Sequence, residues 1–115
     1  MDKPDLELKD IGQYYGTEFY HSIMLGVKAT DGVEYIMRNG YSWLVTDAIV
    51  VAKMKLQKEE FLVVTLKLLK EGDADMIITD GNEHELYKQH YNYTNAKREI
   101  TFYITDNIVL LPSEN

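Results

Sequence analysis

The chain has 115 residues, a formal net charge of −7 and no cysteine. This length allows one hydrophobic core, so we expect a single domain over residues 1–115, with residues 1–10 partly flexible. The missing cysteines exclude disulfides and thiolate nucleophiles and are typical of a reducing compartment. The acidic balance argues against direct nucleic-acid binding, which needs clustered Lys and Arg, and the apolar runs are too short to cross a membrane.

The first part of the chain predicts a short helix followed by a strand. Apolar residues recur at roughly helical spacing over residues 6–15, and Gly16 is a suitable helix end. Residues 17–27 then alternate between two faces, which is typical of a strand with one buried face. The residues expected on the buried face are Phe19, His21, Ile23, Leu25 and Val27.

Two helices are expected next. Thr30 or Asp31 can cap a short helix, and Asn39-Gly40 is expected to end it. The following run, residues 41–56, is apolar on nearly all sides and lacks strand alternation. This pattern indicates a helix that is buried in the core.

From residue 60 onward the apolar pattern has a period of two, which predicts an antiparallel meander. Because the connections are short, we expect its strands to be sequential antiparallel neighbours. The predicted fold class is therefore α+β, with an N-terminal strand and a helical pair packed on one face of a mainly antiparallel β-meander sheet of about five strands. The expected meander strands cover residues 61–69, 74–79, 85–93, 100–104 and 108–111.

His21 and Asp47 are the titratable residues that the patterns direct toward apolar surroundings. A buried carboxylate beside an imidazole can act as an acid/base pair. We favour the alternative that both have structural partners, either each other or, for Asp47, a tyrosine or backbone groups. Without cysteine, and without a serine in a nucleophile-elbow context, nothing supplies an attacking group, so we assign no catalytic residue.

The most biased stretch of the sequence is acidic and contains no Lys or Arg between Glu71 and Tyr87. A solvated surface that aids solubility is its simplest explanation, and a surface that binds a basic host protein is the functional one. A divalent metal site near His84 is less favoured because Asp80-Gly81-Asn82 is typical turn chemistry, so we assign no metal ligand and no cofactor. The acidic residues of this predicted partner-binding surface are Glu71, Asp73, Asp75, Asp80, Glu83 and Glu85.

The tyrosines, nine in all, are more than a core of this size needs. Tyr87, Tyr91 and Tyr93 are expected on one face of the 85–93 strand. They either pack beneath the helices or, on an exposed face, contribute to a protein-binding hot spot. We add Tyr87 and Tyr91 to the predicted partner-binding residues.

Several segments follow one another in a recognisable order along the chain. They are Gly16-Thr17-Glu18, Thr30-Asp31-Gly32-Val33-Glu34-Tyr35, residues 41–49, Asp80-Gly81-Asn82, Tyr93-Thr94 and Leu110-Leu111-Pro112-Ser113-Glu114. In this order they resemble a family of small bacterial and phage proteins catalogued only as a domain of unknown function. The resemblance implies a compact domain carried by bacteria, phages and mobile elements, and it implies no activity.

The leading hypothesis is a non-enzymatic phage or mobile-element protein that acts in the host bacterial cytoplasm. It would bind and inhibit a host protein, for example as an anti-CRISPR or other anti-defence inhibitor that presents an acidic surface to a basic nucleic-acid-binding groove. Two alternatives stay open. One is a small metal-dependent hydrolase or nuclease with His21 or His84 assisting, and the other is a homo-oligomeric structural protein, such as a homodimer.

Overall fold

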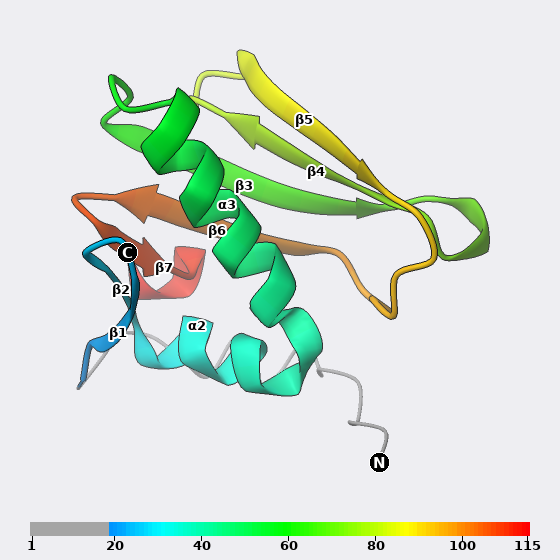
Figure 1. Cartoon of the computed structure of the whole chain (residues 1–115), viewed down its shortest axis with the longest axis horizontal. Helices are drawn as coiled ribbons and strands as arrows, with labels where there is room; N and C mark the ends of the chain where they lie inside the picture. Colours follow the sequence, from blue (N-terminus) through cyan, green and yellow to red (C-terminus); the bar gives the residue numbers. More distant parts are fainter. Residues whose placement is uncertain (1–18) are drawn as a thin grey trace.

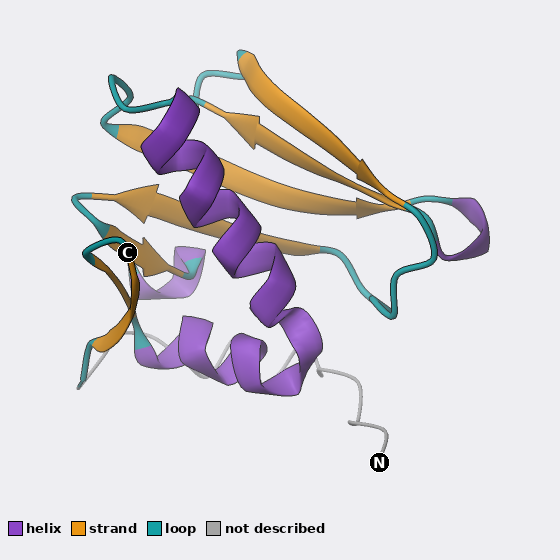
Figure 2. Cartoon of the chain, viewed as in Figure 1, coloured by secondary structure: helices purple, strands orange, loops and turns teal. Residues whose placement is uncertain are grey.

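The computed structural model describes residues 19–115, which form one sheet with helical segments packed against it (Figures 1 and 2). The helix expected over residues 6–15 lies outside the described residues. The strands are β1 His21–Met24, β2 Val27–Ala29, β3 Phe61–Leu68, β4 Ala74–Thr79, β5 Glu85–Tyr91, β6 Ile100–Thr105 and β7 Ile108–Leu110. The helical segments are α2 Asp31–Ile36, η1 Met37–Tyr41, α3 Ser42–Lys55, η2 Lys70–Gly72 and η3 Pro112–Glu114.

All seven described strands belong to one mixed sheet with the order β1-β2-β7-β6-β3-β4-β5. Neighbouring strands are antiparallel except β2 and β7, which are parallel. The α+β class is confirmed, but the expected sheet of about five mainly antiparallel strands is too small. The expected N-terminal strand does not pack on a sheet face; residues 21–29 instead extend the sheet edge as β1 and β2.

The expected meander is correct for β3, β4 and β5 and for the pair β6 and β7, but it is wrong between them, because β5 and β6 are not neighbours. Residues 92–99 carry the chain back across the sheet, and β6 pairs with the other edge of β3. Val63 of β3 therefore lies between Thr79 of β4 and Tyr103 of β6. This return makes β3 a central strand, with its backbone groups paired on both sides.

The strand expected over residues 17–27 is instead the hairpin of β1 and β2. Leu25 and Gly26 form its turn, with φ angles of 52° and 76°, and two consecutive positive φ angles suit a tight hairpin turn. Leu25 and Phe19, which were expected on a buried face, are 53% and 65% exposed. Alternation alone missed the turn because leucine rarely adopts a positive φ.

The two expected helices are α2 and α3, which η1 joins into one helical stretch over residues 31–55 with a bend inside it. Thr30 caps α2, since the Val33 amide donates to Thr30 Oγ1 at 3.5 Å. Asn39 and Gly40 leave the helical conformation, and the φ of Gly40 is 102°, a conformation that favours glycine. The chain turns there and continues as α3.

Helix α3 lies across one face of the sheet (Figure 1) and forms the core with it. Its buried residues are Leu44, Val45, Ala48, Ile49 and Val51. They face buried sheet residues such as Leu62, Val64, Leu66, Met76, Ile78 and Phe102. The expectation of a helix buried on all sides is wrong, because Val50 and Met54 are 39% and 67% exposed on the side away from the sheet.

Candidate functional site

Strand β4 separates the predicted acidic residues into two groups. Glu71 and Asp73 lie at the turn between β3 and β4, whereas Asp80, Glu83 and Glu85 lie where β4 leads into β5. Strand β4 has 6 residues, so the two turns are roughly 20 Å apart at about 3.3 Å per residue. The six carboxylates therefore do not form one continuous patch.

Asp73 and Asp75 have cationic partners on β5. His90 Nδ1 lies 2.7 Å from Asp75 Oδ1, and His90 Nε2 lies 3.3 Å from Asp73 Oδ2. The hydrogen bond between His90 and Asp75 lowers the pKa of Asp75 and raises the pKa of His90. Lys88 Nζ lies 3.6 Å from the other oxygen of Asp75. Asp75 therefore has two basic partners within the protein and Asp73 has one.

Asp80 organises the turn between β4 and β5, in keeping with the turn chemistry read from the sequence. Its Oδ1 accepts the Asn82 amide at 2.8 Å, and its Oδ2 lies 2.8 Å from His84 Nδ1. The hydrogen bond with His84 is the main reason why the pKa of Asp80 is lowered. Glu83 and Glu85 in the same region are exposed.

The tyrosines of β5 pack beneath α3 instead of forming an exposed face. The Tyr91 hydroxyl donates to Asp47 Oδ2 at 2.7 Å, and the Tyr91 ring meets Trp43 edge-on with centroids 4.9 Å apart. Tyr87 lies beneath Lys55, whose Nζ is 5.2 Å from the ring centroid. Tyr93 is not on the same face, because it lies beyond the end of β5 and is 82% exposed.

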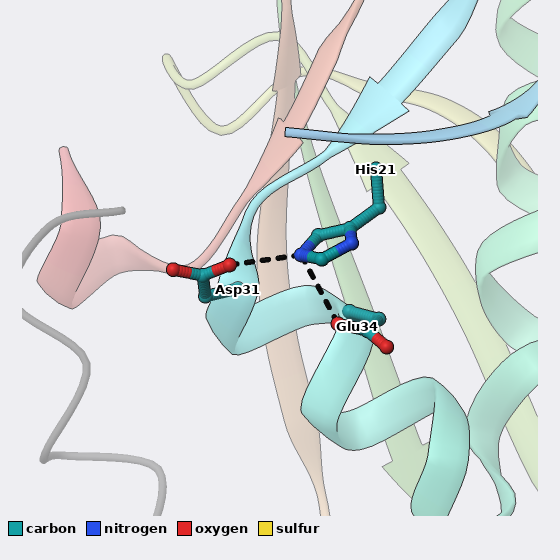
Figure 3. A group of neighbouring side chains, drawn as sticks. All are labelled: His21, Asp31 and Glu34. Carbon is teal, nitrogen blue, oxygen red and sulfur yellow. Dashed lines mark hydrogen bonds and ion pairs between the residues drawn. The ribbon is translucent and has the colours of Figure 1, made fainter. Parts of the chain in front are cut away.

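Asp47 and His21 are not partners. Asp47 has the tyrosine partner that we considered for it, because it accepts the Tyr91 hydroxyl. His21 lies instead between two carboxylates of α2 (Figure 3), with its Nε2 2.8 Å from Asp31 Oδ1 and 3.0 Å from Glu34 Oε2. Sequence reasoning missed this group because it needs the β1–β2 hairpin to return the chain to the start of α2.

Glu114 joins the end of the described chain to the start of α2. Its Oε1 accepts the Thr30 hydroxyl at 2.5 Å and the Leu111 amide at 3.0 Å, while its Oε2 accepts the Gly32 amide at 3.1 Å. A Cβ on Gly32 would lie 2.6 Å from Leu111 Cδ1 and 2.8 Å from Glu114 Oε1. Two of the segments that carry the family resemblance therefore meet here, and glycine lets them approach.

The sheet register gathers a different set of carboxylates at one end of the molecule, which we call the acidic end. Phe61, the first residue of β3, pairs with Thr105 at the end of β6, and Val63 pairs with Thr79 at the end of β4. The chain segments beside these strand ends supply the carboxylates. The acidic end consists of Glu59, Glu60, Asp80, Glu83, Glu85 and Asp106.

A cleft of about 580 Å³ opens at the acidic end, between the C-terminal end of α3, the start of β3 and the β6–β7 turn. Its volume is in the range of small-ligand pockets. Glu59, Glu60 and Asp106 line it, and among residues 19–115 no side chain pairs with their carboxylates. Lys53 also lines the cleft, with its Nζ bonded to Asn107 Oδ1. The apolar lining residues are Val27, Ile49, Ala52, Leu56, Leu62 and Ile104.

Sequence reasoning missed this cleft for a physical reason. Glu59, Glu60 and Asp106 fall in connecting segments, where single carboxylates are common. The only signal was their position directly before expected strands. Only the antiparallel pairing of β3 with β6 brings Asp106 to the same end as Glu59 and Glu60.

The fold and these sites define a small α+β domain with a mixed sheet, an acidic cleft and a histidine–carboxylate group. The chain belongs to the Family of unknown function (DUF6876), whose family model matches residues 5–115. No curated protein and no solved structure matches the chain. None of the helices in the described part of the chain has the length and apolarity needed to span a membrane.

Proposed function

We propose that this protein is a non-enzymatic binding protein that docks its acidic end on a basic surface of a partner protein. The observation that carries the proposal is the cleft, whose mixed polar and apolar lining includes three carboxylates without side-chain partners among residues 19–115. Binding sites commonly combine apolar side chains with polar groups that fix the orientation of the ligand.

An arginine or lysine side chain matches the chemistry of the cleft. Its aliphatic part can lie against apolar residues such as Leu56, Leu62 and Ile104, while its charged head reaches Glu59, Glu60 or Asp106. Lys53 occupies part of the rim, but its ammonium group is bonded to Asn107. The cleft thus offers an anchor for one basic side chain.

The carboxylates around the cleft suit the approach of such a partner. Asp80, Glu83 and Glu85 lie at the same end of the sheet, so they extend the negative potential beyond the cleft. Lys53, which lines the cleft, reduces this potential. Rim charges of this kind raise association rates, and they make binding sensitive to salt.

The test uses a fluorescein-labelled peptide of alternating arginine and serine, with fluorescence anisotropy as the readout. The cleft variant combines Glu59→Gln, Glu60→Gln and Asp106→Asn. The matched control combines Glu71→Gln, Glu83→Gln and Glu85→Gln, which changes the net charge equally. Urea unfolding checks that both variants fold.

We expect the cleft variant to bind the peptide about tenfold more weakly, because the cationic head loses three carboxylate partners, although these are exposed. The control variant should lose less affinity, mainly through slower association and a weaker salt dependence. Equal losses in both variants would mean that only net charge matters and would overturn the cleft as the anchor. The absence of peptide binding to the unmodified chain would overturn the proposal as a whole.

The narrower form of the proposal is an anti-CRISPR or other anti-defence inhibitor from a phage or mobile element. The net charge of −7 supports it, since an acidic surface can occupy a groove that otherwise binds nucleic-acid phosphates. We expect the protein to compete with nucleic acid for such a host protein. Simultaneous binding of both, measured with labelled DNA, would contradict this form.

A second candidate function is self-association through the sheet face opposite α3. Val63 and Tyr103 are register partners on that face, and the Phe61 and Tyr103 rings lie 5.0 Å apart. Apolar and aromatic side chains on a sheet face are typical of homodimer interfaces. Light scattering measures the oligomeric state in solution. A dimer that becomes a monomer on Tyr103→Lys substitution supports this function, and a monomer at high concentration excludes it.

A further inference from the structure

We propose that His21, Asp31 and Glu34 bind a divalent transition-metal ion such as Zn²⁺. One donor atom of each residue lies within 4.8 Å of the donor atoms of the other two. Figure 3 shows the three side chains pointing toward one another. An imidazole nitrogen and two carboxylate oxygens are ligands that Zn²⁺ accepts. This site is independent of the cleft, which is lined by other residues.

The chain builds this group from two elements that the β1–β2 hairpin brings together. His21 is the first residue of β1, and its pairing with Ala29 of β2 places it beside the segment that enters α2. Asp31 is the first residue of α2, and Glu34 follows three residues later, so the two carboxylates share one helix face. His21 completes the group from the strand side.

The separations of the donor atoms fit a metal centre. Metal–ligand bonds of about 2.0–2.2 Å at tetrahedral or octahedral angles place neighbouring donors roughly 2.8–3.5 Å apart. His21 Nε2 lies 2.8 Å from Asp31 Oδ1 and 3.0 Å from Glu34 Oε2. Both separations therefore need little change, and the donor atoms of Asp31 and Glu34 lie within 4.8 Å of each other.

Glu34 has a further partner, which orients its carboxylate. The Arg38 Nε contacts Glu34 Oε1 at 3.2 Å, which holds this carboxylate with its Oε2 toward His21. The three side chains are 32%, 25% and 30% exposed, which leaves room for water to complete the coordination.

The test is isothermal titration of the whole chain with Zn²⁺, with Mg²⁺ as a comparison ion, on the unmodified protein and two variants. His21→Gln removes the proposed ligand. His84→Gln is the matched control, because His84 also contacts a carboxylate, Asp80, but lies outside the group. Urea unfolding without metal confirms that each variant folds.

We expect one Zn²⁺ to bind per chain, at least about tenfold more weakly in His21→Gln and unchanged in His84→Gln, with little response to Mg²⁺. Equal affinity in the unmodified chain and His21→Gln would overturn the proposal, as would the absence of Zn²⁺ binding. If His21→Gln does not fold, NMR of the imidazole nitrogens in the unmodified chain decides. Zn²⁺ must then shift the His21 signals and leave those of His84 and His90 in place.

Discussion

The carboxylate of Glu114 should be a main stabilising contact between the two segments that it joins. It accepts three hydrogen bonds, from the Thr30 hydroxyl and from the amides of Leu111 and Gly32. Glu114→Gln keeps the shape of the side chain but replaces one acceptor oxygen with an NH₂ group. That group cannot accept a bond from an amide or a hydroxyl, so at least one donor loses its partner.

The size of the effect follows from the hydrogen bonds that are lost. A hydrogen bond to a charged group contributes about 1.5–3 kcal/mol. Because the Glu114 carboxylate is only half-buried, we expect Glu114→Gln to lower the free energy of unfolding by about 2 kcal/mol. For a domain of this size that corresponds to a Tm lower by about 8 °C. Urea unfolding followed by circular dichroism gives the free energy of unfolding directly.

Two further variants make this reasoning testable. Glu85→Gln alters an exposed carboxylate and should change the free energy of unfolding by less than about 0.5 kcal/mol. Thr30→Val removes one donor of the same group, so its effect should not add to that of Glu114→Gln. The reasoning is refuted if the free energies of unfolding of Glu114→Gln and the unmodified chain differ by less than about 0.5 kcal/mol. It is also refuted if the effects of Glu114→Gln and Thr30→Val are fully additive in the double variant.

Two other predictions concern β5. Tyr91→Phe should destabilise the fold by about 1–3 kcal/mol, because it removes the hydroxyl donor to a carboxylate, whereas Tyr93→Phe at an exposed position should have almost no effect in the same urea assay. The mutual contact of His90 and Asp75 raises the pKa of His90 and lowers the pKa of Asp75. Its stabilisation is therefore largest between about pH 4 and 6.5, and it is lost as the pH rises through the pKa of His90 or falls through that of Asp75. His90→Gln should flatten this pH dependence of the unfolding midpoint, and an unchanged profile would contradict the assignment.

Local pattern was enough to determine the main elements of this protein. The helix α3 followed from a long apolar run without alternation, and the bend before it followed from Asn39-Gly40. The strands β3, β4 and β5 could be predicted because apolar residues alternate there with a period of two and turn residues separate the segments. The interpretation of Asp80 as a turn residue came from the same local signals, because its amide partner is two residues away.

Only the tertiary structure decided which strands are neighbours and which side chains meet. The return of β6 to β3 brings Asp106 to the same end of the sheet as Glu59 and Glu60. The β1–β2 hairpin places His21 between the two carboxylates of α2, and the end of the described chain places Glu114 at the start of that helix. Periodicity reports which face of an element is buried, but strand order and register depend on contacts between residues far apart in the sequence. The acidic end and the histidine–carboxylate group therefore exist only in the folded chain.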